Sequence, residues 1–167
     1  MKEIQLTQGK VALVDDEDFD RVNAFKWQAC LHRRVWYARR SEWPSLKAVR
    51  MHSFVLALHG SGGSVQIDHR DGNGLNNQKS NLRVATCAQN QINRGLPCNN
   101  TSGFKGVYRK GRSWVARLHY SGSKISLGSY ADPAEAARAY DRKAQELFGE
   151  FAWLNFPREN NSDSTAR

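Results

Sequence analysis

The stretch that decides the fold of the first half of the chain reads VQIDHRDGNGLNNQKSNLRVAT and covers residues 65–86. A strand reaches the Asp68-His69 pair, and a loop rich in Gly and Asn then reverses the chain. Residues 81–84 return as a second strand, and Thr86, with a Gln three residues later, is the pattern of a capping box. The stretch therefore predicts a strand, a loop, a second strand and a helix.

Polar and basic side chains gather around this Asp-His pair. Asn90, Asn93 and Arg94 share one face of the predicted helix, because residues three and four apart are neighbours on a helix. Arg70 and Arg83 add positive charge close to the pair, where a phosphate would have to sit. Taken alone, the aspartate is better explained by capping or by an ion pair with Arg70, and the histidine by a half-buried imidazole whose hydrogen bonds are satisfied.

The net charge indicates an anionic partner. The chain carries 25 Lys and Arg side chains against 16 Asp and Glu side chains, a formal charge of +9. Such an excess is typical of proteins that bind polyanions, because neutralised phosphates release counterions, but it also favours solubility alone. Residues 103–130 hold basic residues and no acidic one, which makes them a candidate electrostatic footprint. These basic residues are Lys105, Arg109, Lys110, Arg112, Arg117 and Lys124.

Several classes of protein are disfavoured by the sequence. The longest apolar run, residues 54–58, is far shorter than the roughly 20 residues that cross a bilayer. The start of the chain lacks the apolar segment of a secretory signal. Cys30, Cys87 and Cys98 have no C-x-x-C spacing, so neither a disulfide framework nor a zinc site is indicated. We expect a cytoplasmic protein with no membrane partner.

The second half has a clearer pattern. Residues 106–109, 113–120 and 124–130 are short β-like runs separated by turns that contain Gly, which predicts a three-stranded antiparallel sheet. Residues 132–148 follow as a helix, with Asp at the N-cap, Pro at the first helical position and Gly as the stop. Its Ala-rich face is expected to pack closely on the sheet.

Three pieces of the first half together closely resemble the HNH nuclease motif, the ββα-metal finger of phage and intron-encoded homing endonucleases. They are the Asp68-His69 pair, the segment NLRVAT that begins at Asn81, and the helix segment QNQINR that ends at Arg94. The resemblance covers roughly residues 1–95.

This resemblance implies a role for each matched residue. His69 is the implied general base, and Asp68 and Asn90 are the implied ligands of one divalent cation, Mg²⁺ or Mn²⁺. Asn81 is expected to tie the loop together and orient His69, with Asn77 as a weaker candidate for the same work. The expected DNA contacts of this half are Arg70, Arg83, Asn93 and Arg94.

Segments of the second half resemble the APETALA2/ethylene-response-factor DNA-binding domain of plants, over about residues 101–157. They are TSGFKGVY, WVARL, LGSY, EAARAYD and LNFP. In that family the sheet lies in the major groove of DNA. For Trp114, packing within the sheet is as good an explanation as contact with DNA. The implied DNA contacts are Lys105, Tyr108, Arg109, Lys110, Arg112, Trp114, Arg117 and Lys124.

The two resemblances imply an α+β fold with two domains. The first is an HNH nuclease domain at 1–95, and the second is a DNA-binding domain at 103–157, in which a three-stranded antiparallel sheet packs on one helix. A linker at 96–102 joins them, and a disordered tail follows at 158–167. We expect a metal-dependent, site-specific, homing-type endonuclease that hydrolyses double-stranded DNA, as a monomer or a homodimer, in a bacterial or phage-infected cell. The alternatives are a DNA-binding regulator with an idle nuclease fold and a nonspecific HNH nuclease.

Overall fold

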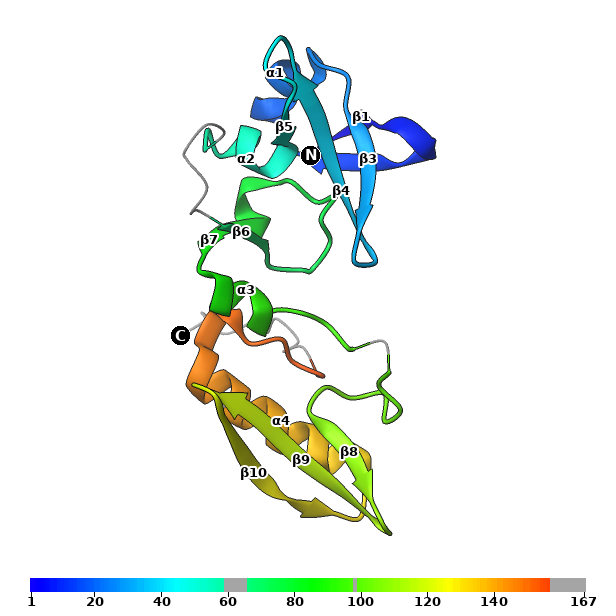
Figure 1. Cartoon of the computed structure of the whole chain (residues 1–167), viewed down its shortest axis with the longest axis vertical. Coiled ribbons are helices and arrows are strands. Elements are labelled where there is room, and N and C mark those ends of the chain that lie inside the picture. The colour runs from blue at the N-terminus through cyan, green and yellow to red at the C-terminus, as the bar shows by residue number, and fades with distance from the viewer. Residues whose placement is uncertain (59–65, 98, 157–167) are drawn as a thin grey trace, which may run out of the picture. The chain divides into compact units, whose positions relative to one another are not determined.

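The computed structural model describes residues 1–58, 66–97 and 99–156, so the tail predicted at 158–167 lies outside the described residues. The chain divides into two compact units, Met1–Asn93 and Arg94–Arg167, which we call unit 1 and unit 2. Both combine small antiparallel sheets with a few helices (Figure 1). No helix in the described part of the chain is long and apolar enough to cross a bilayer.

Unit 1 begins with a two-stranded antiparallel sheet of β1 (Lys2–Gln5) and β2 (Val11–Val14). The apolar side chains of this sheet, such as Ile4 and Val14, are buried. Val22, which is also buried, closes this end of the core. The short helices around the sheet are η1 (Thr7–Gly9), η2 (Asp16–Asp18) and α1 (Phe19–Asn23).

A three-stranded antiparallel sheet follows, with its strands in the order β3 (Gln28–His32), β4 (Val35–Glu42), β5 (Lys47–Arg50). Side chains alternate between the two faces of a strand, and Ala29 and Ala38 pair on the face that joins the core. Tyr37 and Arg39 lie on the other face of β4, and Arg50 is the cross-strand partner of Arg39. We call the side of the sheet with these three residues the polar face.

The predicted order of strand, loop, strand and helix is present at the end of unit 1 (Figure 1). Its elements are β6 (Gln66–His69), β7 (Leu82–Ala85) and α3 (Cys87–Ile92), with η3 (Lys79–Asn81) before β7. The predicted capping box is confirmed: Gln89 N donates to Thr86 Oγ1 at 3.2 Å, and Thr86 N donates to Gln89 Oε1 at 2.8 Å. The box fixes where α3 starts and therefore which of its residues face β6.

One further helix of unit 1 brings a distant residue to this region. α2 (Met51–Val55) directly follows β5 and buries Met51 and Val55 in the core. His52 between them is also buried.

Unit 2 contains one sheet and one long helix. The strands β8 (Val107–Lys110), β9 (Ser113–Tyr120) and β10 (Ser123–Tyr130) pair antiparallel with β9 in the centre. Helix α4 (Pro133–Phe148) begins at Asp132, whose side chain accepts a hydrogen bond from Glu135 N at 3.2 Å. A short helix η4 (Gly149–Phe151) follows α4 directly.

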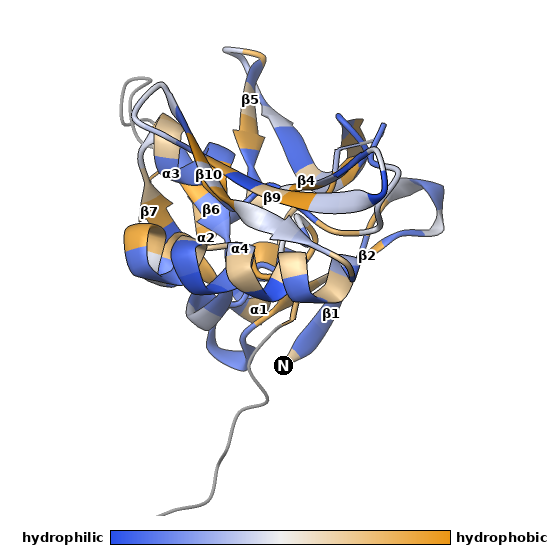
Figure 2. Cartoon of the chain, turned by 90° about the horizontal axis from the view of Figure 1, so that it is seen from below, coloured by the Kyte–Doolittle hydropathy of each residue, from blue (hydrophilic) through white to orange (hydrophobic). Residues whose placement is uncertain are grey.

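Small side chains let α4 lie close to this sheet. Ala136, Ala137 and Ala144 of α4 are buried, as are Ala116 and Leu118 of β9. Figure 2 shows hydrophobic and hydrophilic bands alternating along α4, as expected for a helix that buries one face. One face of the sheet is therefore covered by α4.

Candidate active site and nucleic-acid interface

The carboxylate of Asp68 is buried and held from two sides. Arg83 stands opposite Asp68 in the register of β6 and β7, and its Nε and Nη2 atoms donate to Asp68 Oδ2 at 2.8 and 2.6 Å. Just after α3, Asn93 Nδ2 donates to Asp68 Oδ1 at 3.1 Å, Asp68 Oδ2 at 3.0 Å and the His69 carbonyl at 2.8 Å. We call Asp68, Arg83 and Asn93 the Asp68 clamp.

The clamp changes the roles expected of two residues. The sequence predicts DNA contacts at Arg83 and Asn93, but these residues are only 7% and 6% exposed. A buried carboxylate requires a compensating charge and hydrogen bonds, and these two side chains supply them. The ion-pair interpretation of Asp68 is thus realised with Arg83 as a partner. Arg70 and Arg94, the other contacts expected of the nuclease domain predicted at 1–95, are exposed.

Asn90 faces the same strand as the clamp. Its Nδ2 donates to Gln66 Oε1 at 3.1 Å, and Gln66 lies two residues from Asp68, on the same face of β6. Within the described residues Asn90 Oδ1 accepts no hydrogen bond. The amide oxygen predicted to bind a metal is therefore left available by the fold.

The oxygen ligands in this region suit Mg²⁺ or Mn²⁺ better than Zn²⁺, which is usually held by Cys and His side chains. Asp68 and Asn90 offer a carboxylate and an amide oxygen, which are hard donors. Across residues 1–58, 66–97 and 99–156 there is no group of three or more His, Cys, Asp or Glu side chains that could hold a metal ion. Mg²⁺ commonly binds one or two carboxylates together with substrate phosphates and water, so a small ligand set of this kind fits it.

The imidazole of His69 lies in a cluster of rings. The ring centre of His52 is 5.1 Å from that of His69, with an angle of 73° between the planes. Tyr37 is 5.9 Å from His69 and 6.1 Å from His52. We call Tyr37, His52 and His69 the ring cluster, and it joins β4, α2 and β6.

Burial determines both the hydrogen bonding and the pKa of the His69 imidazole. His69 Nε2 is buried and has no hydrogen-bond partner among the described residues, and the same holds for Asn77 Oδ1. Burial lowers the pKa of His69 below its ordinary value, while the side chain of Asn77 and the carboxylates of Asp71 and Asp68 act in the opposite direction. Burial thus favours the uncharged imidazole, the form that a base requires.

Two members of the ring cluster are not predicted from the sequence. His52 and Tyr37 lie far from His69 in the sequence, and no motif spacing links them to it. Burial lowers the pKa of His52 to about 3, and the charges of His69 and Arg50 add to this effect. Only the packing of α2 and β4 against β6 reveals that these rings surround His69.

Asn81 organises the loop between β6 and β7. Its Nδ2 donates to Asp71 Oδ1 at 2.9 Å and to the Asn76 carbonyl at 2.8 Å, and Asp71 N donates to Asn81 Oδ1 at 3.1 Å. These bonds tie the loop together, as expected. The side chain of Asn81 thus fixes residues that follow His69, whereas the side chain of Asn77 raises the pKa of His69 itself.

The expected DNA contacts of unit 2 fall on both faces of its sheet. Cross-strand partners share a face, so Tyr108 lies with Val115, and Arg109 lies with Trp114. Trp114 packs against the core formed by the sheet and α4, which favours its packing role over base contact. Arg109 Cζ lies 5.8 Å from the centre of the Trp114 ring and belongs to the same side.

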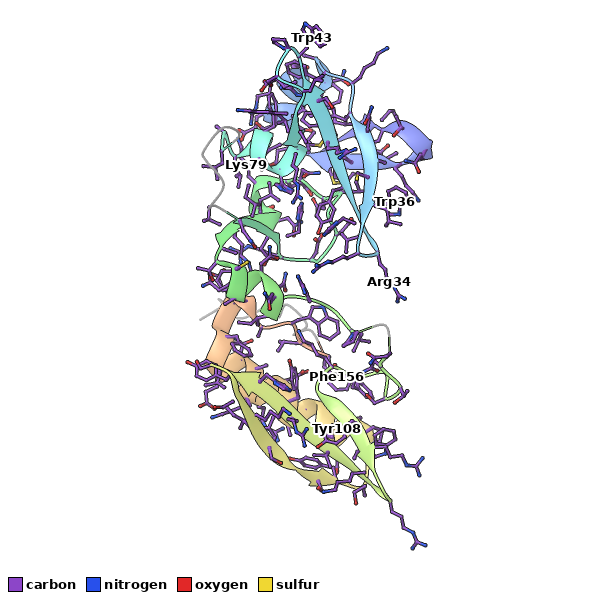
Figure 3. All side chains as sticks on the ribbon, viewed as in Figure 1. Arg34, Trp36, Trp43, Lys79, Tyr108 and Phe156 are labelled. Atoms are coloured by element: carbon purple, nitrogen blue, oxygen red, sulfur yellow. The ribbon has the colours of Figure 1, made fainter. Side chains whose placement is uncertain are left out.

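The opposite face of this sheet holds the other basic side chains. Arg117 Cζ lies 4.7 Å from the centre of the Tyr108 ring, a cation–π contact that fixes the guanidinium. Lys110 and Lys124 are exposed on this face, and Arg112 lies in the exposed turn between β8 and β9. Figure 3 labels Tyr108 on β8. We call Tyr108, Lys110, Arg117 and Lys124 the outer face of unit 2.

Lys105 lies before the sheet and is engaged elsewhere. Its Nζ donates to the Arg94 carbonyl at 2.6 Å and lies 5.5 Å from the centre of the Trp153 ring. Burial lowers the pKa of Lys105 to about 8. The sequence predicts a DNA contact at Lys105, but the structure gives this side chain contacts within unit 2.

Known proteins similar to this chain carry two kinds of name. The chain is 33% identical over 144 residues to an uncharacterized HNH endonuclease of Acanthamoeba polyphaga mimivirus, and the match covers 82% of this chain and 74% of the relative. It is 38% identical over 76 residues to dehydration-responsive element-binding protein 2A of Arabidopsis thaliana, across 44% of this chain but only 23% of the plant protein. Both resemblances drawn from the sequence are confirmed by these matches.

A phage protein is also similar. Protein 3.8 of Escherichia phage T7 is 39% identical over 88 residues, which cover 52% of this chain and 72% of the phage protein. No family model matches the chain. No solved structure matches it either.

The Asp68 clamp predicts a large difference between two arginines. Arg83→Gln should lower the free energy of unfolding by about 3–5 kcal/mol, because it leaves a buried carboxylate without its partner. Arg94→Gln removes an exposed guanidinium and should change it by less than about 0.5 kcal/mol. Urea unfolding of the full chain, followed by circular dichroism, measures both. Equal unfolding midpoints for the two variants would show that Asp68 is not clamped in solution.

The buried His52 predicts acid sensitivity. The unfolded chain takes up a proton at an ordinary histidine pKa of about 6.5, whereas folded His52 has a pKa of about 3. The folded state therefore loses stability as the pH falls below about 6.5, by about 1.4 kcal/mol per pH unit for this residue. The NMR shift of His52 Hε1 should stay constant from neutral pH to about pH 4, and His52→Gln should flatten the acid dependence of unfolding. A His52 midpoint near 6.5 would contradict the burial.

Proposed function

The chain belongs to the HNH endonuclease family, and on that premise we propose that it is a metal-dependent, site-specific DNA endonuclease of the homing type. In this proposal residues 1–95 form the nuclease domain, 96–102 a linker and 103–157 a DNA-binding domain of APETALA2/ethylene-response-factor type. The phage relative supports an origin in a bacterial or phage-infected cell. The substrate is double-stranded DNA, and the bond hydrolysed is a phosphodiester.

One observation carries the proposal: a buried histidine stands directly beside a clamped carboxylate. His69 follows Asp68 on β6, and the clamp holds both the carboxylate of Asp68 and the carbonyl of His69 through Asn93. The imidazole is fixed by the ring cluster. A base held in one orientation can take a proton from a water that attacks phosphorus, and this is the role we assign to His69.

Asn77 is the residue that we assign to orienting the imidazole. Its Oδ1 atom and His69 Nε2 are both buried and lack partners among the described residues, and its side chain acts on the pKa of His69. A hydrogen bond from Nε2–H to Asn77 Oδ1 would satisfy both atoms. This tautomer leaves the lone pair on Nδ1 to accept the proton from water.

Asp68 and Asn90 are the residues that we expect to hold Mg²⁺ or Mn²⁺, together with oxygens of the DNA phosphate. A cation bound there would neutralise the negative charge that develops on the phosphate and on the departing oxygen. Arg83 and Asn93 keep Asp68 in place for this role. Exposed Arg70 and Arg94 are left to contact neighbouring phosphates.

Unit 2 is assigned to anchoring the enzyme on duplex DNA. Its outer face is basic and lies opposite the helix α4, as a groove-reading sheet requires. Linkage of two DNA-binding units on one chain raises the effective concentration of each on the same duplex. This assignment also supports the second candidate function, a DNA-binding regulator with an idle nuclease fold, because the plant relatives are named as element-binding proteins.

Cleavage of DNA separates these candidates. Incubated with plasmids that carry candidate host loci, the wild-type chain should nick or cut DNA in Mg²⁺ or Mn²⁺, and EDTA should stop the reaction. His69→Ala should lower the cleavage rate by about 10²–10⁴-fold, because the general base is lost, while DNA binding in a gel-shift assay stays unchanged. His32→Ala, which removes an exposed histidine of β3, is the matched control and should cleave normally.

Each rival has its own outcome in this assay. Intact plasmid with wild-type protein in both metals, with binding preserved, would support the regulator. Cleavage at random positions on both strands would support a nonspecific nuclease. Discrete cleavage positions that disappear in His69→Ala would support the site-specific enzyme.

A further inference from the structure

Two arginines face each other on the polar face of the β3–β4–β5 sheet. Arg39 of β4 and Arg50 of β5 are direct cross-strand partners, and both are exposed. Like charges directly opposite one another destabilise a sheet. No ion pair with a carboxylate is formed by either residue within the described part of the chain. The pair therefore weakens the fold and is left open to an anion.

Arg40, a neighbour of Arg39 on β4, has a structural role with which the two exposed arginines can be compared. Arg40 lies on the core side of β4, and its Cζ is 4.1 Å from the centre of the Phe25 ring. It also forms an ion pair with Glu42 at 3.5 Å, and its side chain is 11% exposed. Arg39 and Arg50 have neither the burial nor the carboxylate of Arg40.

The polar face leads directly to His69. Tyr37 precedes Arg39 by two residues on β4, so both side chains lie on this face, and Tyr37 belongs to the ring cluster around His69. Arg50 Cζ lies 5.9 Å from the centre of the Tyr37 ring. The pKa of His52, lowered chiefly by burial, is lowered further by the charges of His69 and Arg50. Arg50 is thus close to two of the three rings of the cluster.

We propose that Arg39 and Arg50 bind backbone phosphates of the DNA strand beside the phosphodiester that reaches His69. The inference rests on the proposed function, because it is that function which brings a DNA strand to His69. A guanidinium binds a phosphate through two parallel N–H bonds, and a phosphate between the two arginines also removes their repulsion. The DNA then lies along β4 and β5 of unit 1, which Figure 1 shows as neighbouring strands.

Salt-dependent binding of a short, fluorescently labelled DNA duplex of mixed sequence tests the pair. The full chain is titrated in EDTA, so that no cleavage takes place, at several salt concentrations. Arg39→Gln and Arg50→Gln should each lower the slope of log K against log salt by about 1, and the double variant by about 2. Each single change should weaken binding roughly three- to ten-fold at low salt.

Lys47→Gln is the matched control, because it removes one exposed positive charge from the other face of the same strand. It should leave the slope nearly unchanged. The arginine variants should also melt at the wild-type temperature or above it, because they remove a like-charge pair. Slopes of the double variant equal to those of wild type, or a loss in Lys47→Gln as large as in the arginine variants, would overturn the proposal.

The binding assay and the cleavage assay test the arginine pair and the nuclease activity independently. A wild-type chain that never cuts DNA, while the double variant loses about 2 in slope, refutes the nuclease and supports the arginine pair as a DNA contact. A wild-type chain that cuts DNA, while the double variant binds with an unchanged slope, refutes the arginine pair and leaves the nuclease standing.

Discussion

The buried carboxylate of Asp68 is the constraint on which the candidate active site depends. A charge in the protein interior is tolerated only when an opposite charge and hydrogen bonds surround it. Arg83 meets this demand from β7, and Asn93 meets it from the end of α3. Three elements are therefore fixed around one group, and Asn93 also holds the carbonyl of His69. The hydrogen bonds that stabilise the buried carboxylate of Asp68 therefore also help to position His69.

The remaining parts of unit 1 complete this arrangement from outside. The ring cluster joins β4 and α2 to β6, so the imidazole of His69 is buried among its neighbours, and this burial lowers its pKa. Asn81 ties the loop that follows His69. Within unit 1, Arg39 and Arg50 carry positive charge on the polar face. Unit 2 has a basic outer face of its own. The excess of charge in the composition thus has defined places in both units.

The local features of the structure follow from the sequence, and the long-range ones do not. The capping box of Thr86 and the end of α4 depend on neighbouring residues, so spacing alone predicts them. The partnership of Asp68 with Arg83 depends on the register of β6 and β7, which a motif does not reveal. His52 reaches His69 only through the packing of α2, and Trp114 and Arg109 share a face only because β8 and β9 pair in that register.

We propose that Asp68 and Asn90 hold the catalytic cation beside His69. The most direct measurement is a crystal structure of the His69→Ala chain bound to a duplex that the wild-type enzyme cuts, grown with Mn²⁺. Anomalous scattering then locates the metal. We expect one Mn²⁺ ligated by Asp68, Asn90 and an oxygen of the uncut phosphate. A metal held by other residues, or an uncut phosphate bound away from Asp68, would contradict it.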